Sequence, residues 1–147
     1  MEIGPGNAPI LLGSEIPEVY LMDKSKKLCE DLRKKGATAT HSKVVIENKD
    51  FQKSTWGNFG LIVLNEVLCM VRPKDRIKQL KRIIRHSKCL LLIERVGMPL
   101  KGLESIIVTI GELENMKRLL EVNNWNLEYR VVSGKDYDYA IIAARKI

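Results

Sequence analysis

Apolar residues recur in short blocks along the whole chain, and blocks with helical spacing alternate with blocks typical of strands. The run Leu61–Leu64 is continuous, which suits a strand that is covered on both faces. The predicted strands are a short one ending at Gly4, then 19–22, 43–47 (with 37–40 as a rival), 61–64, 89–93, 126–132 and 137–144. The predicted helices begin at Pro9, at Ser25 (ending near Lys35, before Gly36), within 72–88, and at Glu112 (ending at Trp125). This alternation predicts an α/β fold with a mostly parallel sheet.

The last two predicted strands are separated by the four residues 133–136 only. A parallel crossover needs a dozen residues or more, so these strands must pair antiparallel as a hairpin. The sheet is therefore expected to be mixed at its C-terminal side.

Length and composition favour a single globular domain over residues 1–147, with 45% hydrophobic and 29% charged residues. No apolar stretch approaches the ~18 residues of a membrane span. Three cysteines at wide spacing, Cys29, Cys69 and Cys89, suit reduced thiols in a cytoplasmic protein. With the distant His41 and His86 they form no metal pattern, and we expect no metal.

The net charge of +7 is concentrated in residues 72–88, where eight Lys and Arg residues accompany one acid, Asp75. On a helix, Ile77, Leu80, Ile83 and Ile84 would share one face and the basic residues would occupy the rest. The simpler interpretation is a solvated outer face. The alternative is a surface that binds nucleic acid, although no aromatic side chain is interleaved for base stacking.

Candidate chemistry lies at the start of the chain. Glu2–Ala8 reads Glu-Ile-Gly-Pro-Gly-Asn-Ala, and Asp23 ends the next predicted strand. Glycines after a strand let the backbone approach a ligand closely. A carboxylate about 20 residues further on is placed to bind ribose hydroxyls in nucleotide-binding α/β folds. The simpler alternatives are an ordinary turn and a helix cap formed by Asp23.

Glu2–Ala8 and the strand end Tyr20–Asp23 resemble the first two motifs of the class I S-adenosylmethionine-dependent methyltransferases. Phe59–Leu68 is similar to the fourth strand of that family, and Tyr139–Arg145 to its inserted antiparallel strand. The resemblance covers the whole chain. It implies a three-layer sandwich whose seven strands follow the order 3-2-1-4-5-7-6, and methyl transfer from S-adenosylmethionine to an unidentified acceptor.

The resemblance also implies roles for single residues. Gly4 and Gly6 would pass beneath the cofactor, Glu2 would orient its amino group, and Asp23 would bind both ribose hydroxyls. The remaining implied positions are Asp50 (rival Glu47) at the adenine, Asn65 and Glu66 facing the acceptor, and Glu66 as the candidate general base.

A dinucleotide-binding enzyme is the main alternative, but its fingerprint requires a third glycine where this chain has Pro9. The sequence also lacks the N-terminal helices that usually close the cofactor site in the class I methyltransferases. The chain is then expected to be a fragment, to receive a lid from a partner in an oligomer with its interface near the open mouth, or to be a non-catalytic binding domain.

Overall fold

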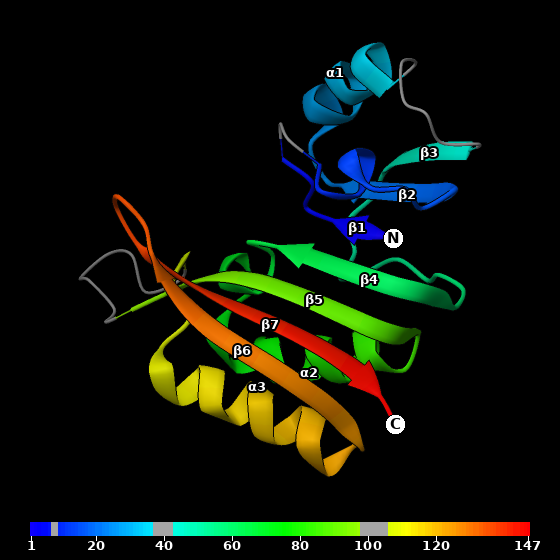
Figure 1. Ribbon diagram of the computed structural model, residues 1–147. Helices are drawn as coiled ribbons and strands as arrows, with labels where there is room; N and C mark the ends of the chain where they lie inside the picture. The colour runs from blue at the N-terminus through cyan, green and yellow to red at the C-terminus, as the bar shows by residue number, and fades with distance from the viewer. Residues whose placement is uncertain (7–8, 37–42, 98–105) are drawn as a thin grey trace. The chain divides into compact units, whose positions relative to one another are not determined.

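The structure is a computed structural model, and it describes residues 1–6, 9–36, 43–97 and 106–147 (Figure 1). Its internal contacts divide the chain into two units, Met1–Gly57 and Asn58–Ile147. The seven strands follow the order β3-β2-β1-β4-β5-β7-β6. The predicted α/β class, the mostly parallel sheet and its strand order are confirmed.

In its described residues, the first unit is a three-stranded parallel sheet with one α-helix. Its elements are β1 (Glu2–Ile3), the 3-10 turn η1 (Leu11–Gly13), β2 (Glu18–Asp23), α1 (Lys26–Gly36) and β3 (Lys43–Asn48). Both pairs, β1 with β2 and β2 with β3, are parallel. Cys29 and Leu32 of α1 are buried with Val19 and Leu21 of β2, which fixes the helix on this sheet. As predicted, Ser25 caps α1, because its Oγ accepts the Leu28 N–H at 3.2 Å.

The helix predicted from Pro9 is only the single turn η1. The backbone N–H of Ser14 donates to the Leu11 carbonyl at 3.2 Å, and its hydroxyl donates to the same oxygen at 2.7 Å. These bonds close the turn, and Pro17 then leads into β2. The rival third strand at 37–40 lies outside the described residues, while the preferred strand is present as β3.

The described part of the second unit contains four strands and two α-helices. Its elements are β4 (Phe59–Asn65), the 3-10 turn η2 (Leu68–Met70), α2 (Pro73–Ile84), β5 (Ser87–Val96), α3 (Ile110–Val122), β6 (Trp125–Ser133) and β7 (Asp138–Lys146). β4 and β5 are parallel, whereas β7 runs antiparallel to both β5 and β6. The predicted antiparallel hairpin is therefore confirmed.

Burial along β5 alternates with the strand period. Leu90, Leu92, Glu94 and Val96 are buried, and the residues between them are half-buried. Figure 1 shows α2 and α3 on the same side of the second unit's strands. Leu80 and Ile83 of α2 and Met116 and Leu120 of α3 are buried there and form the core.

Two expectations in this unit were wrong. Arg76 was assigned to the solvated face of the basic helix, but it is only 1% exposed. Trp125 was placed at the end of a helix, but it is the first residue of β6. The helix ends earlier because Asn124 has a positive φ of 62°, a conformation that asparagine tolerates and that redirects the chain.

Within the described ranges, no helix has both the length and the apolar character that crossing a membrane requires.

Candidate cofactor site

The glycine turn after β1 has the backbone conformation that its sequence predicts. Gly4 and Gly6 have φ values of 67° and 58°, a region that residues with a Cβ rarely adopt. The Gly4 N–H donates to the Met22 carbonyl of β2 at 3.0 Å, so the turn begins beside the end of that strand. A Cβ added at Gly6 would meet no heavy atom within 4 Å. The turn therefore leaves space beside its own backbone.

Asp23 is the last residue of β2 and directly follows Met22, the residue that accepts the Gly4 hydrogen bond. The structure thus brings the glycine turn and the strand-end acid together, as the sequence predicted. Asp23 Oδ1 accepts the Ser25 N–H at 2.8 Å, which supports the turn into α1. In the described part of the chain, Oδ2 accepts no hydrogen bond and stays available to a ligand.

Asp50 lies two residues after the end of β3. Its Oδ1 accepts the Gln52 N–H at 2.9 Å, so the side chain helps to form a turn. The backbone N–H of Lys49 and the side-chain amide of Asn48 donate to the Asp23 carbonyl at 2.9 and 3.1 Å. These bonds join the end of β3 to the end of β2. The assignment of Asp50 to the adenine stays a prediction.

The rival candidate, Glu47, has a charged partner of its own, because its Oε1 lies 3.0 Å from Lys49 Nζ. A ligand amino group would have to compete with that ammonium. Neither acid is thereby excluded, and the choice between them stays open.

Glu2 is fully buried on β1, and its carboxylate binds the backbone where η1 begins. Oε1 accepts the Ile10 N–H at 3.1 Å and Oε2 accepts the Leu11 N–H at 2.9 Å. Burial raises the pKa of Glu2, and these two backbone hydrogen bonds partly offset that shift. Glu2 therefore has a structural role that sequence reasoning missed, and its contact with a cofactor amino group stays a prediction.

Asn65 and Glu66 belong to the second unit, at the end of β4. Glu66 has a positive φ of 53°, and its N–H donates to the Ile93 carbonyl at 2.7 Å. Its carboxylate forms an ion pair with Arg95 of β5. To act as a base, Glu66 would have to leave this guanidinium. The acceptor-facing roles of Asn65 and Glu66 stay predictions.

Glu94 is a buried acid that sequence reasoning missed. It is 2% exposed on β5, and its two oxygens accept the Leu68 and Cys69 N–H groups at 2.9 Å each. Burial raises the pKa of Glu94 to about 7, although these hydrogen bonds oppose the shift. An acid at an inward position of an apolar strand was the available signal. Glu94 holds η2 as Glu2 holds η1.

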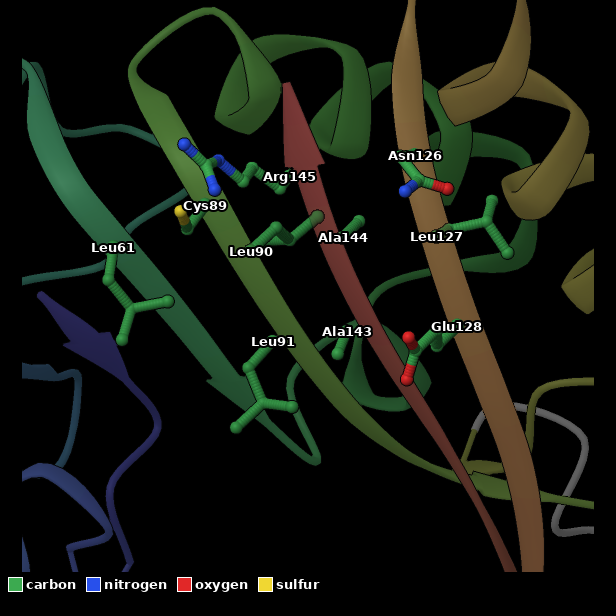
Figure 2. Close-up of a pocket in the computed structure, with 10 residues that line it drawn as sticks. All are labelled: Leu61, Cys89, Leu90, Leu91, Asn126, Leu127, Glu128, Ala143, Ala144 and Arg145. Atoms are coloured by element: carbon green, nitrogen blue, oxygen red, sulfur yellow. The ribbon is translucent and has the colours of Figure 1, made fainter. Parts of the chain in front are cut away.

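A separate groove of about 430 Å³ lies on the second unit's sheet (Figure 2). It is lined by Leu61, Cys89, Leu90, Leu91, Asn126, Leu127, Glu128, Ala143, Ala144 and Arg145. These residues come from β4, β5, β6 and β7, and none of them is a predicted cofactor residue. The groove is therefore distinct from the glycine turn and the strand-end acid of the first unit.

The fold is that of the class I methyltransferases, as solved structures show. Magnesium protoporphyrin IX methyltransferase from Synechocystis with bound SAH aligns at a TM-score of 0.77 and 14% identity, over 99% of this chain and 73% of that one. The N-methyltransferase NodS from Bradyrhizobium japonicum gives 0.77 and 14%, over 99% and 83%. TrmK from M. capricolum in complex with S-adenosyl-homocysteine gives 0.68 and 11%, over 99% and 60%. By sequence, neither a family model nor a curated protein matches the chain.

Proposed function

We propose that the chain binds S-adenosylmethionine and transfers its methyl group to an acceptor. The observation that carries this proposal is the pairing of a glycine turn with an acid at the neighbouring strand end. Gly4 bonds to Met22, and Asp23 follows with one carboxylate oxygen unoccupied within the described residues. The solved neighbours of the same fold that were crystallised with SAM or SAH support the choice of ligand.

Each candidate site residue of the first unit has a specific role in this proposal. Asp23 Oδ2 accepts from the ribose hydroxyls, and a charged acceptor makes these hydrogen bonds relatively strong. Gly4 and Gly6 let the ligand lie against the backbone, because no Cβ occupies the space beside the turn. Glu2 keeps this loop in place through Ile10 and Leu11. Asp50 is the candidate for the adenine amino group.

Methyl transfer requires few further groups from the protein. The sulfonium of the bound cofactor supplies an activated methyl group. The chain's own residues bind and orient the reactants, since alignment of the attacking atom with the methyl group accounts for much of the rate. A base is required only if the acceptor must lose a proton, and Glu66 is the candidate once it separates from Arg95. The three free thiols fit our proposal that the protein acts in the cytoplasm.

Calorimetry with S-adenosylmethionine, S-adenosylhomocysteine and NAD tests the proposal. Asp23→Ala removes the ribose acceptor and should weaken binding of the sulfur ligands by roughly 2–4 kcal/mol. Asp23→Asn keeps an oxygen for the Ser25 N–H, so it separates loss of ribose binding from loss of the turn. Asp31→Ala on α1 is the matched control and should leave affinity unchanged.

Three results would change the assignment. Tighter binding of NAD than of both sulfur ligands would favour a dinucleotide-binding protein. Equal affinities for wild type and Asp23→Ala would contradict the proposed site. Tight binding of S-adenosylmethionine with no S-adenosylhomocysteine formed from any acceptor pool would indicate a non-catalytic binding domain.

A further inference from the structure

The strand β6 ends the sheet and exposes apolar side chains. It pairs with β7 along its length, and no other described strand borders it (Figure 1). Tyr129, Val131 and Val132 are 51%, 48% and 44% exposed. Natural proteins usually protect such an edge with charged side chains, proline, a bulge or a very short strand. β6 has nine residues and no proline, and its charged residues are one acid, Glu128, and one base, Arg130.

We propose that β6 is the interface of a homodimer, in which two copies pair antiparallel about a two-fold axis at Tyr129. The edge of each sheet would then be closed by the same edge of the other copy. A two-fold interface requires one surface to be complementary to itself. β6 meets that requirement through its charges as well as its apolar residues.

The charges of β6 are self-complementary in this register. Glu128 lies opposite Ala143 of β7 and Arg130 lies opposite Ile141, so the two charged residues share one face of the strand. With the axis at Tyr129, Glu128 of each copy stands directly across from Arg130 of the other. Opposite charges in cross-strand positions stabilise a sheet, and like charges there destabilise it. Two attractive pairs form in each dimer.

Neighbouring registers lose this complementarity. Residues opposite each other in an antiparallel pair must point to the same face. The two-fold axis therefore has to lie between two copies of the same residue. An axis at Glu128 places the two glutamates together, and an axis at Arg130 places the two arginines together. Only the Tyr129 axis combines opposite charges with contacts between Leu127 and Val131 on the other face. The charge pattern therefore specifies a second copy of this chain and one register.

Sedimentation equilibrium on charge-reversal variants tests the proposal. The wild type should be a dimer that dissociates on dilution. Arg130→Glu leaves only acids on this face and Glu128→Arg leaves only bases, so each variant alone should dimerise at least about tenfold more weakly. An equimolar mixture of the two variants should dimerise like the wild type, because every Glu again faces an Arg.

The matched control is Lys34→Glu, an exposed reversal on α1 that should leave dimerisation unchanged. Glu128 and Arg130 are both exposed, so circular dichroism should show intact folding of every variant. A wild type that is monomeric at all concentrations would overturn the proposal. So would single variants that dimerise normally, or a mixture that fails to recover.

Discussion

Single residues in this chain carry tasks that their type alone does not reveal. Glu2 and Glu94 are both buried acids that accept two backbone N–H groups from a 3-10 turn. Such bonds satisfy amides that a short turn leaves unpaired. Asp23 uses one oxygen in the same way and keeps the other available in the described part of the chain. Glu2 and Glu94 differ from Asp23 in their burial and in their hydrogen bonds, although all three are acids.

We predict that Glu94 makes stability depend on pH. The pKa of Glu94 is about 7 in the folded chain and 4.5 when the side chain is not buried, as in the unfolded chain. Between pH 4.5 and pH 7 the folded protein therefore holds a proton that the unfolded chain has released. The free energy of unfolding should therefore fall by about 3 kcal/mol as the pH rises from 4.5 to 7, and then level.

Glu94→Gln removes this titration and is the variant to compare. Urea unfolding of both proteins at several pH values should show wild-type stability falling relative to the variant across that window. A difference that is flat, or that rises with pH, would contradict the assignment.

At the scale of elements, Arg76 joins three of them. From α2 its guanidinium donates to the Leu68 carbonyl of η2 at 2.9 Å, to the Ile107 carbonyl at 2.8 Å and to Glu112 Oε2 of α3 at 2.7 Å. Glu112 also completes the capping box with Thr109 that begins α3. A basic residue predicted for the surface is thus the link between η2, α2 and α3.

Replacing Arg76 by Met should destabilise the fold by about 3–5 kcal/mol, because the buried carbonyls and Glu112 lose their donor. Lys78→Met on the exposed side of the same helix is the control and should change stability by no more than about 0.5 kcal/mol. Unfolding in guanidinium chloride measures the free energy of unfolding of both variants. Equal losses for the two variants would show that the buried hydrogen bonds do not carry the effect.

At the scale of the whole molecule, the net charge of +7 favours acidic partners. Lys74, Lys78, Lys81 and Arg85 of and beside α2 are exposed, whereas Arg76 is not. This exposed set is the basic surface that our nucleic-acid hypothesis requires. Binding through phosphate groups would weaken steeply with salt.

Reversing Lys78, Lys81 and Arg85 to Glu should weaken binding to RNA and DNA. It should also flatten the dependence of log K on log salt by about 0.9 for each duplex phosphate that the variant no longer neutralises. Reversing Lys26, Lys27 and Lys34 on α1 makes an equal charge change elsewhere. Fluorescence anisotropy at several salt concentrations compares the two. Equal effects, or none, would remove α2 as a specific binding surface.

From its residues alone, the sequence predicted the alternation of strands and helices, the antiparallel hairpin, and the glycine turn with Asp23 at the next strand end; the strand order came from the resemblance to the class I methyltransferases. The continuous apolar run Leu61–Leu64 indicates a strand covered on both faces, and the short 133–136 connection requires an antiparallel pair. These signals are local, because each depends on residues that are neighbours along the chain.

Tertiary structure decided which polar residues are buried and what they bind. Arg76 and Glu94 are polar in the sequence, and their buried positions follow from the segments that pack against them. The end of α3 before Trp125 depends on a positive φ at Asn124, which no periodicity predicts. The hydrogen bonds of Arg76 and Glu94 join segments that are distant in the chain, so their partners are known only once the backbone is folded.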